Sequence, residues 1–130
     1  MTGKIIDGRM IAQQLREDIS NRVAQFIKLR KKRPGLAVVL VGDNPASHVY
    51  VKNKVKACEK VGIKSEVVQF STTVHEEEVI AKIKALNTDD NIHGILIQLP
   101  LPLSMQTSRV IAHIAPHKDV DGLHPQNLGL

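Results

Sequence analysis

The sequence predicts an α/β domain of three layers, in which a mostly parallel sheet is flanked by helices. Apolar, β-branched runs without polar alternation occur at 36–41 and 95–97, as strands buried on both faces require. Segments with apolar residues at helical spacing separate the strands. Strands joined by single helices lie parallel in one sheet and carry the helices on its faces. The 130 residues, 42% of them apolar, suffice for one core, so we expect one domain over 1–130.

Two helices are expected around the first strand. The first helix covers 8–31, with Asp7 as its N-cap, and Pro34-Gly35 ends it. Its apolar stripe consists of Ile11, Leu15, Ile19, Val23, Phe26 and Ile27. The strand at 36–41 leads through a loop at 42–45 into a helix at about 47–60, which Gly62 closes.

The second half of the chain alternates in the same way. A strand is expected at 63–70, and Thr73 with Glu76 forms a capping-box pattern that opens a helix to about Leu86. The third strand covers 94–98, a shorter helix follows at about 107–114, and the chain is expected to be irregular from Pro116.

Composition and charge narrow the function classes. The single Cys58 excludes an intramolecular disulfide, and six scattered His with one Cys show no zinc-type spacing, so we expect no metal. No apolar stretch has the length of a membrane span and no signal peptide is recognisable, so we expect a cytoplasmic protein without a membrane partner.

The net charge of +5 and the basic run at 28–33 suggest nucleic-acid binding. Cations at a helix end complement its dipole, however, and three aromatic residues are too few for a stacking platform, so we expect no nucleic-acid partner. The excess charge favours an anionic small molecule or simply solubility.

Gln98 stands at the end of the third strand, directly before Leu99-Pro100-Leu101-Pro102. Each proline lacks a backbone donor and holds the preceding residue extended, so the strand must stop here. The carboxyl ends of strands in open α/β sheets are where ligands bind. Gln98 is therefore a candidate ligand-binding residue, although a solvated glutamine after a proline-terminated strand is the plainer interpretation.

The second helix carries Ser47, Tyr50 and Lys54 at positions i, i+3 and i+7, which predicts that they share one face. A neighbouring face suited to the core consists of Val51, Val55 and Cys58. Because this helix directly follows the first strand, its first turns lie at the same rim of the sheet as Gln98. A tyrosine and a lysine on a helix are commonly plain surface residues, so the shared rim is what makes them candidates.

A fourth candidate segment, 118–125, contains Asp119, Val120 and Asp121. In an extended chain the two carboxylates project to one side and Val120 to the other, so Val120 could anchor the segment while a carboxylate faces a ligand. The alternative is a charged loop that ends in an Asp-Gly turn.

Together these segments resemble the N-terminal half of the bifunctional methylenetetrahydrofolate dehydrogenase and methenyltetrahydrofolate cyclohydrolase family. The resemblance covers essentially the whole chain. The motifs that carry it, in order, are Ile6-Asp7-Gly8, the run at 36–47 (LAVVLVGDNPAS), Tyr50-Val51 with Lys54 and 56–58 up to Gly62-Ile63, the run at 94–102 (GILIQLPLP) and the run at 118–125 (KDVDGLHP).

The resemblance implies roles for individual residues. Tyr50 would stack on the folate, Lys54 would be the catalytic general acid and base, Gln98 would orient Lys54, and Asp121 would hold the pterin ring. Ser47, Leu99 and Pro100 would complete the set that binds the substrate.

The chemistry of this family requires such residue types. Hydride loss from the methylene bridge of tetrahydrofolate creates a methenyl cation, and hydrolysis of that cation requires a water to be deprotonated beside it. A protonated Lys54 would repel the cation, whereas a neutral Lys54 could accept the proton. Gln98 can bond to the amine without adding a charge, and Asp121 offers two oxygens that match the paired donors on a pterin edge.

The chain departs from the family in length. Family members continue into a second, Rossmann-type domain that binds NADP, and no glycine-rich phosphate loop follows a strand here. The resemblance therefore implies NADP as the cofactor, tetrahydrofolate derivatives as substrates and a homodimer for the complete enzyme, with the dinucleotide domain absent from these residues. The function is either this oxidoreductase and hydrolase activity, with the chain supplying the folate site, or a non-catalytic folate-binding or interaction module.

Overall fold

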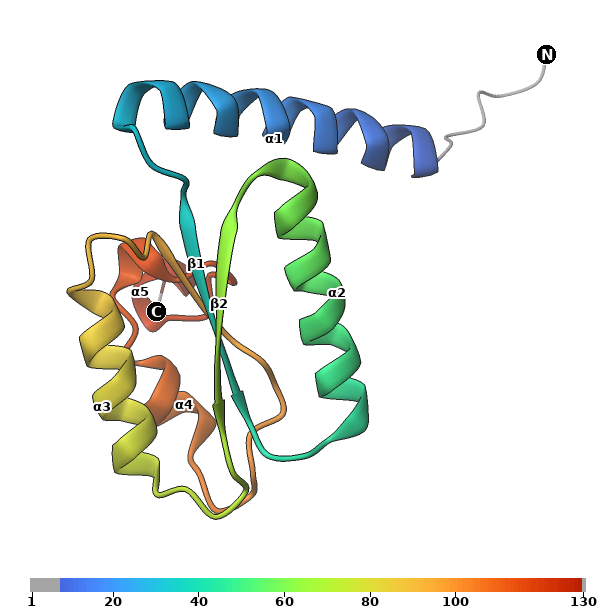
Figure 1. The fold of residues 1–130 in the computed structure, drawn as a ribbon. Helices are drawn as coiled ribbons and strands as arrows, with labels where there is room; N and C mark the ends of the chain where they lie inside the picture. The colour runs from blue at the N-terminus through green and yellow to red at the C-terminus, as the bar shows by residue number, and fades with distance from the viewer. Residues whose placement is uncertain (1–7, 130) are drawn as a thin grey trace.

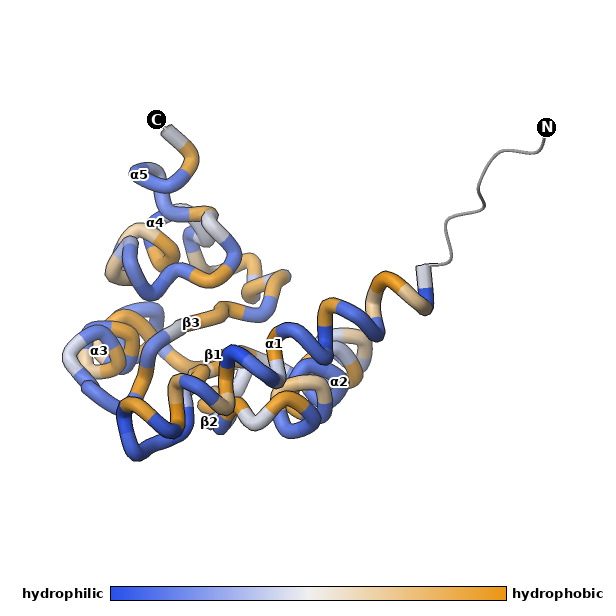
Figure 2. The backbone as a smooth tube through the Cα atoms, turned by 90° about the horizontal axis from the view of Figure 1, so that it is seen from above, coloured by the Kyte–Doolittle hydropathy of each residue, from blue (hydrophilic) through white to orange (hydrophobic). Residues whose placement is uncertain are grey.

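A parallel sheet of three strands forms the middle layer of the computed structural model, which describes residues 8–129 (Figure 1). The strands, in the spatial order β2-β1-β3, are β1 (Gly35–Val41), β2 (Lys64–Phe70) and β3 (Gly94–Ile97). Helix α2 (Pro45–Val61) lies on one face of the sheet, and α3 (Glu76–Asn87) with α4 (Thr107–Ile111) lies on the other (Figure 2). The predicted three-layer α/β class is confirmed.

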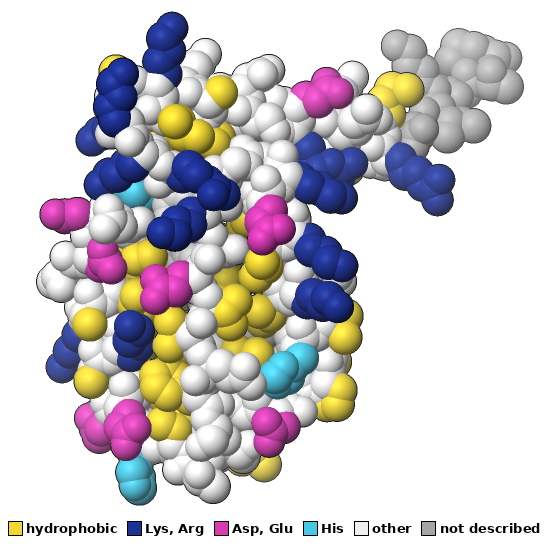
Figure 3. Space-filling view, viewed as in Figure 1, with side chains coloured by type: hydrophobic (Ala, Val, Ile, Leu, Met, Phe, Trp, Pro, Cys, Tyr) yellow, Lys and Arg dark blue, Asp and Glu magenta, His cyan; other side chains and the backbone are white. Residues whose placement is uncertain are grey.

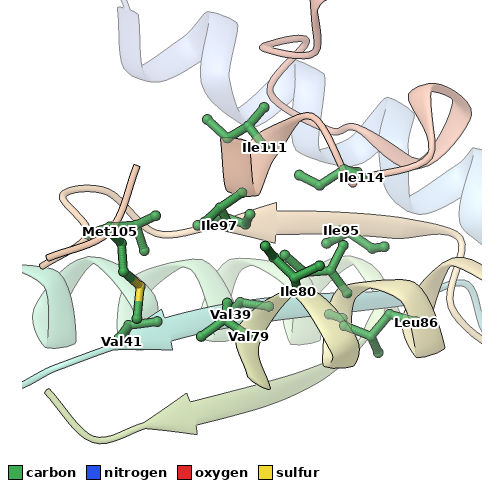
Figure 4. Packing of buried hydrophobic residues seen from close by; sticks show 14 of the residues in the cluster. Val39, Val41, Val79, Ile80, Leu86, Ile95, Ile97, Met105, Ile111 and Ile114 are labelled. Atoms are coloured by element: carbon green, nitrogen blue, oxygen red, sulfur yellow. The ribbon is translucent and has the colours of Figure 1, made fainter. Parts of the chain in front are cut away.

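Side chains of β1 alternate between two cores, one on each face of the sheet. Ala37 and Val39 belong to the larger core, which contains residues of α3 such as Ile83, and Figure 4 shows its packing. Val38 and Leu40 point the other way, where Val51 of α2 covers them. The apolar run at 36–41 lacks polar alternation because both faces of this central strand are buried.

The register of β3 against β1 decides where Gln98 points. Val39 pairs with Ile97, and the Gln98 N–H continues the ladder by donating to the Val39 carbonyl at 2.9 Å. Leu96 lies in the core beneath α2, while Ile97 lies in the core beneath α3. Because successive side chains alternate, Gln98 falls on the α2 face.

Strand order places a switch point between β1 and β3. The chain leaves β1 for β2 through α2 on one face, and leaves β2 for β3 through α3 on the other. The loop that follows β1 leads to α2, whereas the loop that follows β3 leads to α4 on the other face. The two loops therefore diverge at the carboxyl ends of these strands, where α/β domains bind ligands.

Helix α1 (Gly8–Arg30) lies across the opposite end of the sheet (Figure 1). Its apolar stripe is only partly used: Val23 is buried, whereas Ile11, Leu15 and Ile19 are 44%, 57% and 41% exposed. Figure 2 shows why, because the N-terminal half of α1 extends beyond the rest of the domain. The expected N-cap, Asp7, and most of the Ile6-Asp7-Gly8 motif lie outside the described residues.

Several predicted boundaries are wrong. Helix α3 begins at Glu76 after His75, and Thr73 does not cap it, since its hydroxyl lies 3.0 Å from that of Ser71. Helix α4 ends at Ile111 instead of continuing to 114. The segment from Pro116 is not wholly irregular, since a 3-10 turn covers Pro116–Lys118 and a short helix α5 covers Pro125–Leu128, each with a proline in its first turn.

The basic run at 28–33 lies where α1 meets the amino ends of the strands, where Figure 3 shows a concentration of Lys and Arg side chains. Arg33 donates to the carbonyls of Gly62 and Ile63, and Lys32 donates to that of Asp90. Part of the run thus holds α1 to neighbouring loops, far from the carboxyl ends of the strands. Over residues 8–129, no helix combines the length and the hydropathy needed to cross a membrane.

Candidate active site at the carboxyl ends of the strands

Helix α2 is capped at both ends, and this fixes where its side chains lie along the direction of the strands. Asn44 caps its start by accepting a hydrogen bond of 3.2 Å from the Ser47 N–H, and Pro45 occupies the first turn. Gly62 ends it in the left-handed region at φ 91°, where its N–H bonds to carbonyls of the last turn. The first turns of α2 therefore stand at the carboxyl end of β1.

Lys54 and Gln98 form the centre of the candidate site. The Lys54 Nζ donates a hydrogen bond of 2.7 Å to the Gln98 Oε1, and the Gln98 Nε2 donates to the Leu99 carbonyl at 3.1 Å. Gln98 is only 6% exposed, whereas Lys54 lies at the surface. The glutamine is thus a fixed, uncharged acceptor that holds one end of a longer and more mobile side chain. The contact expected from the sequence is confirmed, while the roles of both residues stay predictions.

Ser47 and Tyr50 do not share one environment, contrary to the expectation from their spacing. Ser47 is 2% exposed, and Tyr50 is 55% exposed. Four positions separate Ser47 from the buried Val51, so these two residues share the stripe that faces the sheet. Tyr50 presents its ring to solvent near the rim, where it is available to stack on a ligand.

Asp121 lies within electrostatic reach of Lys54. Its carboxyl borders a hollow walled largely by isoleucines and by Leu123, and this burial raises the pKa of Asp121, an effect that the nearby Lys54 ammonium opposes. Asp121 and Lys54 therefore influence each other electrostatically, while the direct contact of Lys54 is with Gln98.

Asp119 points into the same hollow but is used by its own loop. Its Oδ2 accepts hydrogen bonds from the His124 N–H at 2.7 Å and from the Asn127 Nδ2 at 2.9 Å. Burial opposes ionisation, but these hydrogen bonds outweigh it and hold the pKa of Asp119 below its ordinary value. Asp119 is thus a structural carboxylate, and Asp121 is the one that remains for a ligand.

Val120, which the sequence suggests as the anchor of this segment, is not a core residue. Val120 is 55% exposed. Its backbone N–H donates to the Ile95 carbonyl at 3.4 Å, so the segment is held to the edge of β3 by the main chain. A Cβ on Gly94 would meet the Val120 Cγ2 at 2.7 Å, and glycine therefore permits this close approach.

Leu99 and Pro100 begin the segment that leaves β3, and the peptide bond between them is cis. Both side chains are exposed, while Leu101 is buried and fastens the segment to the core. Pro100 lines a groove of about 300 Å³ with the loop at 42–44 and with Thr72. Pro100 thus borders this groove, which is separate from the hollow beside Asp121, while Leu99 lines neither of them.

Two polar side chains, Lys118 and Asn87, fasten the segment at 113–118 to the C-terminal end of α3. Lys118 is only 9% exposed, and its Nζ donates to the carbonyls of Leu86 and Asp89, both at 3.0 Å. Asn87 holds the backbone of His113 and Ala115. No local pattern marks either residue, because their partners lie 26 to 32 positions away in sequence.

Residues 8–129 contain neither a cluster of metal-ligating side chains nor a glycine-rich phosphate loop after a strand. Within 8–129, no three His, Cys, Asp or Glu side chains gather closely enough to hold a metal ion. The loop that follows β1 contains a single glycine, Gly42, and those that follow β2 and β3 contain none. These loops do not match the phosphate-binding pattern of a dinucleotide site.

Fold and site define a class: a parallel α/β domain with a lysine, held by a buried amide, at its switch point. The chain belongs to the tetrahydrofolate dehydrogenase/cyclohydrolase family, whose catalytic-domain model matches residues 6–121. The match confirms the resemblance noted in the sequence.

Individual relatives agree with this assignment. The chain is 52% identical over 129 residues to the bifunctional protein FolD of Paracidovorax citrulli and 53% identical over 129 residues to that of Geobacillus thermodenitrificans. Each alignment covers 99% of this chain and 45% of the relative. The chain thus spans a little under half the length of the curated relatives that it matches.

Solved structures give the same result. A bifunctional FolD dehydrogenase/cyclohydrolase from Campylobacter jejuni matches with a TM-score of 0.90 and 46% identity, over 95% of this chain and 43% of that one. A methylenetetrahydrofolate dehydrogenase-cyclohydrolase from Trypanosoma brucei, complexed with NADP cofactor and an inhibitor, matches with a TM-score of 0.90 and 32% identity, over 99% of this chain and 44% of that one.

Proposed function

We propose that this chain supplies the folate site of an enzyme of one-carbon metabolism. The complete enzyme would oxidise 5,10-methylenetetrahydrofolate to 5,10-methenyltetrahydrofolate with NADP and hydrolyse the product to 10-formyltetrahydrofolate. The observation that carries the proposal is the 2.7 Å hydrogen bond from Lys54 to the buried Gln98, at the switch point of the sheet. Membership of the family supports the choice of substrate.

Lys54 would serve as the acid and base of the hydrolysis. Its neutral amine takes a proton from the water that attacks the methenyl carbon, and its ammonium gives a proton to N5 as the bond from that carbon to N5 breaks. One proton of the water thus reaches N5, the other is released to solvent, and the oxygen becomes the formyl oxygen. Gln98 accepts a hydrogen bond from the amine in this cycle and adds no negative charge that would favour the ammonium form.

Asp121 and Tyr50 would bind the folate. The carboxylate of Asp121 accepts two hydrogen bonds from the donors along the pterin edge, which fixes the ring relative to Lys54. The exposed ring of Tyr50 offers a stacking face to the rest of the substrate. Ser47, Leu99 and Pro100 would border the bound folate.

NADP does not fit the residues described here, because the loops that follow the strands lack the glycine pattern that brings a backbone close to a pyrophosphate. NADP would be held outside residues 8–129. For the complete enzyme we also propose a cytoplasmic homodimer.

Calorimetric titration of the 130-residue chain with 5-formyltetrahydrofolate, a stable reduced folate, tests the proposal. Binding is expected, and Asp121→Ala should weaken it by about 1–3 kcal/mol, the cost of leaving donors of the pterin without a partner. Absence of binding to the wild-type chain would contradict the proposal. Binding without hydrolysis of 5,10-methenyltetrahydrofolate would favour the non-catalytic module.

A further inference from the structure

The buried ammonium of Lys118 lies at the carboxyl end of α3. It donates 3.0 Å hydrogen bonds to the carbonyls of Leu86, in the last turn, and of Asp89, just beyond it. A buried charge requires such partners, and a helix C-terminus carries the partial negative charge that suits an ammonium. Lys118 therefore ties its own segment to a rigid element of the core.

Asn87 makes the second tie from the same helix end. Its Nδ2 donates to the His113 carbonyl at 2.7 Å, and its Oδ1 accepts from the Ala115 N–H at 2.8 Å. Asn87 and Lys118 together form what we call the α3 clamp. The clamp holds the segment 113–118 at both of its ends.

The held segment leads directly into Asp121. After Lys118, residue 119 forms a parallel bridge with Ile95, and the Val120 N–H donates to the Ile95 carbonyl. Beyond Asp121, the Asp119 carboxylate holds the N–H of His124. Asp121 thus lies between two fixed points of its loop, one at Ile95 and one at the His124 N–H.

We propose that Lys118 is a positioning residue for folate binding: with Asn87 it holds the segment that presents the Asp121 carboxylate to the pterin beside Lys54. This inference rests on the proposed function. If Lys118 has this function, its removal should weaken folate binding through Asp121 and through no other contact.

A double-mutant cycle separates this function from a general effect on the fold. The 130-residue chain and its variants are titrated calorimetrically with 5-formyltetrahydrofolate. Lys118→Met should raise Kd roughly 3- to 30-fold in the wild-type background and should add nothing in the Asp121→Ala background. The matched control is Lys84→Met, which removes the same charge from an exposed position in the last turn of α3 and should leave Kd unchanged.

A second variant separates geometry from charge. Asn87→Ala removes two hydrogen bonds and no charge, and it should raise Kd in the same way and lose its effect when Asp121 is alanine. If circular dichroism shows that Lys118→Met does not fold, Asn87→Ala still tests whether the α3 clamp positions Asp121.

The outcomes distinguish this inference from the proposed function. Two results would overturn the positioning function alone. In one, the increases in Kd caused by Lys118→Met and Asn87→Ala simply add to the increase caused by Asp121→Ala. In the other, Kd is unchanged in both clamp variants while Asp121→Ala binds weakly. A wild-type Kd in Asp121→Ala itself would instead overturn the pterin contact, and the inference with it.

Discussion

The Lys54 Nζ lies 2.7 Å from the Gln98 Oε1, a contact that joins residues 44 positions apart in sequence. Gln98 is buried and held by its own backbone ladder, whereas Lys54 extends from an exposed helix face. The partner of the lysine is therefore neutral and immobile, which suits a group that must alternate between amine and ammonium during proton transfer.

Replacing Gln98 with a carboxylate tests the importance of a neutral partner. In Gln98→Glu the acceptor remains, but its negative charge favours the ammonium form of Lys54. The rate of methenyltetrahydrofolate hydrolysis should then rise only at higher pH than in the wild-type chain. The pH-rate profile, with Gln69→Glu on the exposed edge strand β2 as the control, checks this. Superimposable profiles of Gln98→Glu and wild type would show that the charge at position 98 does not matter.

Asp119 and Asp121 should affect the acid stability of the chain in opposite directions. Hydrogen bonds lower the pKa of Asp119, so its stabilising contribution is present above its unfolded value of 3.8 and is lost as pH falls through the lower, folded value. Burial raises the pKa of Asp121, so its contribution is present below 3.8 and is lost as pH rises through the higher, folded value.

Urea unfolding at several pH values from about 2.5 to about 6 measures both effects. As pH rises over this range, Asp119→Asn should become less stable relative to the wild-type chain, and Asp121→Asn should become more stable relative to it. Differences that do not change with pH would show that neither carboxyl is perturbed by folding.

The larger core provides a stability prediction. Ile83 is fully buried between α3 and the sheet, so Ile83→Ala should lower the free energy of unfolding by about 2–5 kcal/mol. Leu103 is fully exposed, and Leu103→Ala should change it by less than about 0.5 kcal/mol. Thermal or urea unfolding of the two variants measures the difference, and similar values would contradict the assignment of this core.

The described loops predict that the 130-residue chain does not bind NADP. Titration of the chain with NADP should give only heats of dilution, in contrast to the titration with 5-formyltetrahydrofolate. A saturable isotherm with NADP would place a dinucleotide site within these residues, against the reasoning from the loops that follow the strands.

The parts of the structure that follow from local periodicity could be predicted from the sequence. The apolar runs of β1 and β3 predict buried strands, and the prolines after Gln98 predict where β3 ends. Once β3 is parallel to β1, Lys54 and Gln98 must come from neighbouring elements. Their contact follows from topology and strand alternation.

The parts that depend on distant backbone groups could not be predicted. Lys118 looks like a residue of a charged loop until the carbonyls of Leu86 and Asp89 are known to lie beside it. The spacing of Ser47 and Tyr50 predicts a shared face, but spacing alone cannot tell which side of a helical stripe the sheet covers. In the same way, periodicity predicts the apolar stripe of α1, but it does not predict which part of the helix packs against the rest of the domain.

The most direct test of the account measures hydrolysis of 5,10-methenyltetrahydrofolate by the 130-residue chain and its Lys54→Met variant, under saturating substrate. The matched control is Lys52→Met, which removes the same charge from an exposed position on α2. Because proton transfer contributes about 10²–10⁴ in rate, Lys54→Met should lose that factor while its Kd for 5-formyltetrahydrofolate stays within about threefold of wild type. Lys52→Met should match wild type in both. Near-normal hydrolysis by Lys54→Met, in a chain that still binds the folate, would remove Lys54 from the chemistry and contradict the account.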